Sequence, residues 1–346
     1  MEATITLEKP IINESLTVFI KDTTNALKEV QKIKEVEELL DQVIAQPFQI
    51  KFNNLKLWML TLFFALVCSG YIFKALNTIS YHWNYFDLIF IIILLVGFFW
   101  PIGLISSRAS SITNLNQLFI KKTLHLLYKI GPSTQNFVET INNKFVDFDR
   151  GNYSQNVSWC KELEFNNEDQ NIRVNALQHH YVIERIVTEK VRNGRGGYKT
   201  VKKKVYDHYY REGLVFPPIA EFKSLVISHH EVRKAYTQTF KLASIVFDVK
   251  FYVMANSEFS AAKFLGPSVV LAFEKLSSQF NGVTFEIATD GSILLNQKHT
   301  GILNSNVSSS IVTPREFKED LLKNLTLGNV NIMFAFMNNL IKYLGK

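Results

Sequence analysis

Histidine is the residue type in this chain with the clearest capacity for chemistry, because its ring can bind a metal ion or move a proton near neutral pH. Two doublets occur, His179-His180 and His229-His230, with Glu231 after the second and His208 between them. Adjacent residues on a strand point to opposite faces, so each doublet can place only one imidazole in a given site. The spacing allows a metal site that combines these histidines, but satisfied core or surface histidines explain the pattern as well.

The sequence contains none of the common motifs that indicate a catalytic activity or a nucleotide-binding site. It has no dinucleotide-binding G-x-G-x-x-G turn after a strand, no G-x-x-x-x-G-K-[ST], no H-E-x-x-H, no G-x-S-x-G and no paired C-x-x-C. The glycines between Asn193 and Thr200 are wrongly spaced from Lys199 for a phosphate loop, and they lead into a strand. We therefore expect no cofactor, no metal and no catalytic residue.

Positive charge is concentrated in one segment. Residues 185–211 contain nine lysines and arginines against Glu189 and Asp207, a net charge of +7 that equals the formal net charge of the whole chain. A solvated segment without a dedicated ligand is the first interpretation of this charge. An anionic lipid surface or an acidic protein is the second, and nucleic acid is less favoured. The residues proposed for contact are Arg192, Arg195, Lys199, Lys202, Lys203 and Lys204.

The elements that position these residues follow from periodicity. Alternation over 181–187 and 198–210, with a glycine-rich tip between, predicts a long β-hairpin over 181–210. Asp290-Gly291 predicts a two-residue hairpin turn. Further strands are expected at 214–216, 224–228, 246–253, 283–288 and 292–295. Helices are expected from Ser257 to Phe264, from Ser268 to Phe280, from Pro314 to about Leu325 with Thr313 as its cap, and from Asn329 to Leu344.

Two uncharged apolar stretches, about 57–74 and 88–107, are typical of transmembrane helices. Lys51 and Lys56 precede the first stretch, and Arg108 follows the second. Because lysines and arginines favour the cytoplasmic side of a membrane, both chain termini should lie in the cytoplasm. The loop 75–87 between them would then be external, and its aromatic residues would anchor it at the interface: Tyr81, Trp83, Tyr85 and Phe86. With 47% hydrophobic and 20% charged residues, the chain fits a folded body joined to a membrane anchor.

Amphipathic stripes flank the membrane hairpin. Apolar residues recur at helical spacing within 1–54, an N-terminal cytoplasmic helix, and within 108–141, a juxtamembrane helix. Since a membrane hairpin returns the chain to the same side, these helices should be neighbours. They would form an antiparallel stalk or, alternatively, a seam for homo-oligomers. Residues 142–346 would form one cytoplasmic α+β domain.

The sequence also resembles a known family. The order of two membrane helices, His180-Tyr181-Val182, Tyr206-Asp207-His208-Tyr209 and above all Ala261-Ala262-Lys263-Phe264-Leu265-Gly266-Pro267 is similar to bacterial membrane proteins catalogued as domain of unknown function 3137. The resemblance runs from the first apolar stretch to about Leu295. It implies a multi-pass protein of the bacterial inner membrane with a cytoplasmic α/β body, and it supplies no activity or site.

The predicted fold class is therefore α+β: a two-helix transmembrane hairpin with flanking amphipathic helices, followed by a cytoplasmic domain of sheet and helices. The predicted function is a membrane-anchored binding or scaffold module, with the bilayer and a protein partner or second copy as its contacts. The alternative is a membrane-tethered enzyme, hydrolase-like or metal-dependent. Its polar cluster would have to come from His180, Tyr181, Asp207, His208 and Glu231.

Overall fold

The chain divides into two compact units. The structure is a computed structural model that describes residues 13–77, 85–133, 140–141, 144–166, 171–192, 196–230, 236, 238–241, 244–298 and 301–344. The first unit comprises Met1–Leu126 and Val307–Leu325, and the second comprises Leu127–Asn306 and Thr326–Lys346. Residues 307–325, which were expected to belong to the cytoplasmic domain, therefore pack with the N-terminal helices.

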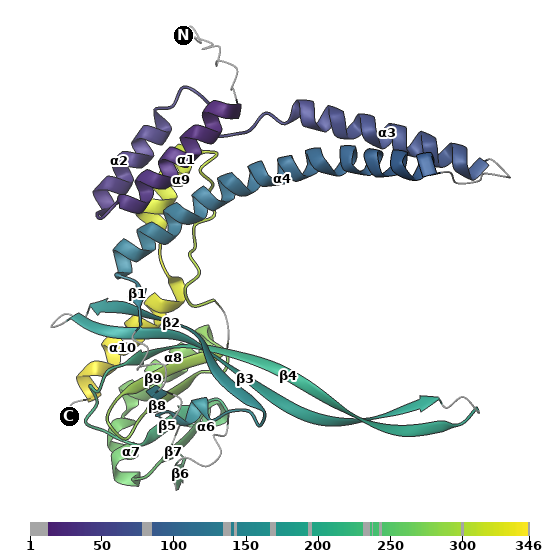
Figure 1. The fold of residues 1–346 in the computed structure, drawn as a ribbon. Coiled ribbons are helices and arrows are strands. Elements are labelled where there is room, and N and C mark those ends of the chain that lie inside the picture. Colours follow the sequence, from purple (N-terminus) through teal and green to yellow (C-terminus); the bar gives the residue numbers. More distant parts are fainter. Residues whose placement is uncertain are drawn as a thin grey trace. The chain divides into compact units, whose positions relative to one another are not determined.

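The first unit is helical (Figure 1). Its elements are α1 (Asn13–Glu29), α2 (Ile33–Ile44), α3 (Leu55–Asn77), α4 (Tyr85–Tyr128), α9 (Pro314–Glu319) and a π-helical turn, η2 (Asp320–Asn324). The predicted N-terminal helix is in fact two helices, α1 and α2. In contrast, the second apolar stretch and the juxtamembrane helix are one continuous helix, α4, with Pro101 inside it.

The amphipathic stripes are buried against one another, as predicted. Leu16 and Leu27 of α1, Leu40 of α2 and Phe119 of α4 are almost inaccessible to solvent. The Phe119 ring meets the Phe317 ring of α9 edge-on with centroids 6.1 Å apart. Lys122 Nζ on α4 donates to the Lys28 carbonyl oxygen at the end of α1, at 2.9 Å. Helices that flank the apolar pair are thus neighbours in this unit.

Helices α3 and α4 are long and apolar enough to cross a membrane, over Leu55–Lys74 and Ile89–Tyr128. They approach closely at Gly97, where an added Cβ would lie 2.3 Å from the Phe64 ring. Tyr71 OH donates to Asp87 near the other end of the pair. Large apolar side chains along both helices are more than half exposed: Trp58, Leu62, Phe63, Leu66, Phe73, Ile93, Val96, Phe99 and Trp100. Tyr81 and Trp83, which were expected to anchor an external loop, lie outside the described residues.

The second unit is built on a nine-stranded sheet in the order β1-β2-β3-β4-β9-β8-β5-β7-β6, in which all pairs are antiparallel. Its strands are β1 (Gly131–Pro132), β2 (Ser154–Asn166), β3 (Asn171–Arg192), β4 (Tyr198–Phe216), β5 (Leu225–Ser228), β6 (Gln238–Phe240), β7 (Tyr252–Ala255), β8 (Thr284–Ile287) and β9 (Ile293–Lys298). The α+β class is thereby confirmed.

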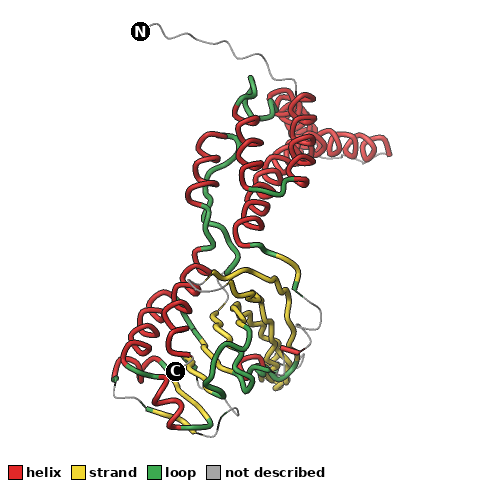
Figure 2. Tube along the Cα trace, turned by 90° about the vertical axis from the view of Figure 1, so that its left-hand side faces the viewer, coloured by secondary structure: helices red, strands yellow, loops and turns green. Residues whose placement is uncertain are grey.

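Short helices cover both faces of this sheet. Helices α8 (Pro267–Gln279) and α10 (Gly328–Leu344) run along one side of it, as Figure 2 shows, and Phe273 and Phe336 from them pack against Phe285 of β8. On the other face, the 3₁₀ turn η1 (Val146–Phe148) packs Phe148 into a second apolar cluster with residues such as Leu177. The remaining helices are α6 (Ile245–Lys250) and α7 (Glu258–Phe264).

Several local predictions were wrong. The expected strand 246–253 begins as helix α6, because Ser244 Oγ accepts from the Phe247 backbone N–H and caps it. The turn at Gly291 has three residues rather than two: Ala288 N–H donates to the Ser292 carbonyl, and Gly291 takes φ +88°. Thr313 precedes α9, but its side chain does not cap that helix. Strand β2 was not predicted at all.

Candidate functional site

The predicted β-hairpin forms an arm that extends beyond the rest of the sheet. Strands β3 and β4 pair as far as Arg192 and Tyr198, whereas β2 supports β3 only up to Val182 and β9 supports β4 only from Arg211. Residues 183–192 and 198–207, here called the arm, are therefore a two-stranded ribbon that has no further strand beside it among the described residues, as Figure 1 shows. At about 3.4 Å per residue, the arm is about 30 Å long.

The register sorts the side chains of the arm onto two different faces. Residues i and 390 − i are paired, so even-numbered residues of both strands share one face and odd-numbered residues share the other. The even face, here called the basic face, carries Lys190, Arg192, Lys202 and Lys204 against Glu184. The odd face, here called the aliphatic face, combines Ile183, Val187, Val191, Val201 and Val205 with Arg185, Lys199 and Lys203 and with the acids Glu189 and Asp207.

The contact residues predicted from sequence divide between these faces. Arg192, Lys202 and Lys204 lie on the basic face, while Lys199 and Lys203 lie on the opposite one; all five are exposed. Arg195 lies outside the described residues. The consecutive lysines 202–204 therefore do not form one contact surface, because neighbouring residues of a strand point to opposite sides.

Part of the charge counted from sequence is neutralised. Lys204 pairs with Glu184 at 3.0 Å, and Arg185 pairs with Asp207. Arg211 is not a surface residue: it is 4% exposed and forms an ion pair with Asp147. The accessible positive charge on the basic face thus rests mainly on Lys190, Arg192 and Lys202. The uncharged rings of Tyr198 and Tyr206 lie on the same face.

The structure brings together one pair of the predicted histidines. His180 Nε2 and His208 Nδ1 are 3.0 Å apart, and His180 Nδ1 lies 3.1 Å from Asn156 Oδ1. An amide oxygen can only accept, so His180 Nδ1–H donates to Asn156 Oδ1. His180 Nε2 then accepts a hydrogen bond from His208 Nδ1–H. The ring planes differ by 1° and their centroids lie 5.3 Å apart, so the two nitrogens point straight at each other. This is the geometry of a shared hydrogen bond, and both rings would have to rotate to chelate one ion.

The other members of the hypothetical polar cluster do not join this pair. Tyr181 and Asp207 are odd-numbered and point to the opposite face from His180 and His208. His229 Nδ1 accepts from the Val283 backbone N–H at 2.8 Å, and its ring stacks on Phe251. Glu231 lies outside the described residues. Over the part of the chain that the structure describes, no group of three or more His, Cys, Asp or Glu side chains could hold a metal ion.

A buried ion cluster in the second unit was not foreseen. Asp147 of η1 is fully buried and pairs with Arg150 and with Arg211 Nε, the latter at 2.9 Å. Asn296 Nδ2 donates to the same carboxylate at 2.7 Å. Burial opposes ionisation of Asp147, but the Arg211 and Arg150 guanidiniums outweigh it and hold the pKa of this carboxyl below its usual range. The cluster joins η1 to β4 and β9.

A second buried carboxyl lies beside this cluster. Glu286 of β8 accepts from the backbone N–H groups of Val146 and Asp147 at 2.8 and 3.1 Å, and from Tyr236 OH at 3.1 Å. Burial raises the pKa of Glu286 to about 7, against these hydrogen bonds, which lower it. One feature of the sequence could have indicated this site: Glu286 stands between the apolar residues Phe285 and Ile287 of a strand.

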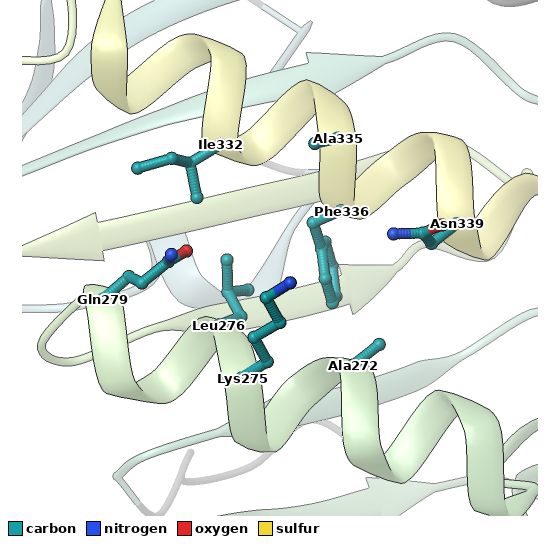
Figure 3. Close-up of a pocket in the computed structure, with 8 residues that line it drawn as sticks. All are labelled: Ala272, Lys275, Leu276, Gln279, Ile332, Ala335, Phe336 and Asn339. Atoms are coloured by element: carbon teal, nitrogen blue, oxygen red, sulfur yellow. The ribbon is translucent and has the colours of Figure 1, made fainter.

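The cavities of the molecule offer few ligand-binding features. A groove of about 150 Å³ lies between α8 and α10, and Figure 3 shows Leu276, Ile332 and Phe336 lining it with Lys275, Gln279 and Asn339. It is smaller than sites that hold a drug-sized molecule. In the first unit, α2 and α9 border an open groove of about 600 Å³, where Lys318 is already paired with Glu37 and Asp41.

Comparison with known proteins adds no function. No protein-family model matches the chain, and no curated protein or solved structure matches it either. The resemblance to domain of unknown function 3137 therefore stays a hypothesis.

Proposed function

We propose that this chain is a membrane-anchored binding module, which uses the basic face of its arm to contact an anionic lipid surface. The observation that carries the proposal is the register of the arm, which gathers Lys190, Arg192 and Lys202 on one face. Lys204 lies on the same face and is paired with Glu184, the single acidic residue on this face among the described residues of the arm. Each such cation near an anionic membrane contributes about 1 kcal/mol of attraction.

The anchor in this proposal is the pair α3 and α4. Soluble proteins rarely leave large contiguous apolar surfaces in water, yet Leu62, Leu66, Val96 and Phe99 are each more than half exposed. A bilayer would cover these side chains. The flanking Lys51, Lys56 and Arg108 favour a topology with both termini in the cytoplasm, and the family resemblance favours the bacterial inner membrane.

Lipid is favoured over other anionic partners because an anchored arm is held near the leaflet at high effective concentration. A protein partner or a nucleic acid would have to be recruited from solution, although tyrosines 198 and 206 could stack on bases. The enzyme alternative has weaker support, since His180 and His208 share a hydrogen bond and point away from the face that carries Tyr181 and Asp207.

The test is co-flotation of the full-length protein, held in neutral-lipid nanodiscs, with vesicles rich in phosphatidylglycerol, an anionic lipid. Lys190→Gln with Lys202→Gln should reduce binding by at least tenfold, because two cations contribute about 2 kcal/mol. The matched control, Lys199→Gln with Lys203→Gln, removes the same charge from the aliphatic face and should change binding much less. Equal losses in both variants, or vesicle binding that does not weaken with salt, would contradict the proposal.

A further inference from the structure

The aliphatic face of the arm has a regular arrangement that the proposed function does not use. Each cross-strand pair on this face joins one aliphatic and one charged side chain, and the charge alternates between the two strands. From the sheet outward, the pairs are Ile183 with Asp207, Val205 with Arg185, Val187 with Lys203, Val201 with Glu189, and Val191 with Lys199. The charges therefore run negative, positive, positive, negative, positive.

An arm of this kind is expected to be covered. A two-stranded ribbon on its own is at best marginally stable in water, and further strands or an element packed on its apolar face are needed to stabilise it. Val191 and Val201 are 42% and 38% exposed on this face. A covering surface must bury these valines and also accommodate the charged residues beside them.

We infer that a second copy of this chain covers the aliphatic face, with the two arms packed face to face and antiparallel about a two-fold axis at the Val187–Lys203 pair. In this arrangement β3 lies over β3 and β4 lies over β4. Asp207 then faces the partner's Lys199, and Arg185 faces the partner's Glu189. Aliphatic residues face aliphatic residues, as in Val205 over the partner's Val201. Such a self-complementary contact is the isologous interface typical of two-fold dimers.

Other occupants fit this face less well. Two arms packed in parallel would place each charged residue over an aliphatic one, for example Asp207 over the partner's Ile183. Lipid chains would meet a charged side chain in every cross-strand pair, and anionic headgroups would meet Glu189 and Asp207. Among these, the antiparallel pair of arms alone buries the valines and places Arg185 opposite Glu189 and Asp207 opposite Lys199. Only Lys203, at the axis, faces a like charge.

The axis provides a specific test, because Lys203 faces its own copy there. Wild-type chains bring two lysines together, and Lys203→Glu chains bring two glutamates together, but a mixed dimer pairs opposite charges. We therefore expect heterodimers to be about twofold to fivefold more stable than either homodimer, the range for an exposed ion pair. The experiment co-expresses two differently tagged full-length chains, extracts them in detergent and measures the heterodimer fraction by sequential affinity purification and light scattering.

Lys202→Glu on the basic face is the matched control and should mix with wild type at random. Glu189→Lys should weaken the homodimer, because it places a lysine opposite the partner's Arg185. Random mixing of Lys203→Glu with wild type would overturn the inference, and so would a monomer at all concentrations. A dimer formed through the helices of the first unit would also mix at random. Neither result depends on lipid binding, so failure here leaves the proposed function standing.

Discussion

Glu286 is the residue whose burial has the clearest measurable consequence. Its pKa rises from a usual value of 4.5 to about 7 because burial disfavours the carboxylate. The folded state therefore holds a proton that the unfolded state releases above about pH 4.5. This contribution to stability is fully present at low pH and is lost as the pH rises through 7. Burial of His179 acts in the opposite direction, since it lowers the pKa of that ring to about 4.

Glu286→Gln removes this proton and keeps the shape of the side chain. Between pH 5 and pH 8, we expect the free energy of unfolding of wild type to fall by about 3 kcal/mol relative to the variant. The difference between the two proteins isolates Glu286, because the histidines are common to both. Thermal unfolding in detergent at several pH values measures it, with the exposed Glu189→Gln as control. A constant difference across this pH range would show that Glu286 does not titrate there.

At the scale of elements, the close contact between α3 and α4 depends on one glycine. Gly97→Ala would place a Cβ within 2.3 Å of the Phe64 ring, and the shift that follows should cost about 1–3 kcal/mol of helix packing. Gly103→Ala in the same helix meets nothing within 4 Å and should be neutral or slightly stabilising, because alanine favours the helix. Gly97→Ala should therefore lower the melting temperature in detergent and Gly103→Ala should not, and an equal fall in both variants would argue against this helix pair.

Elements with long periodic patterns were predictable from sequence. The apolar stretches, the amphipathic stripes and the alternating hairpin 181–210 are each long, and each forms the expected type of element. Their boundaries differ: the N-terminal stripe is split into α1 and α2, and the second apolar stretch continues into the juxtamembrane helix as α4. The short apolar run at 246–250 has no such length, and a single serine cap makes it helix α6. The register of β3 and β4 was also beyond the sequence pattern, and it decides which lysines share a face.

The buried cluster was missed for a different reason. Asp147, Arg211 and Asn296 are far apart in the sequence and meet only because η1 packs on the sheet. No local spacing marks such a group. From the sequence, Arg211 was counted with the surface charge of the hairpin because the residues around it are polar and basic. In the structure Arg211 is buried.

At the scale of the whole molecule, the proposed topology places both chain ends on the same side of a membrane. In a background with Cys68→Ala and Cys160→Ala, a cysteine at Asn77 should react with an impermeant maleimide on intact cells, because it ends α3 near the external loop. A cysteine at Ser154, in the second unit, should react only after permeabilisation. Labelling of both positions in intact cells, or of neither, would contradict this topology.

The central claim is that the basic face of the arm meets anionic lipid, and site-specific photo-crosslinking in native membranes tests it most directly. A photoreactive amino acid at Thr188 lies on the basic face beside Lys202, whereas one at Glu189 lies on the opposite face. Mass spectrometry of the irradiated protein should find phospholipid adducts at 188 and few at 189. Equal lipid adducts at both positions, or adducts at 188 with protein or nucleic acid alone, would contradict the claim.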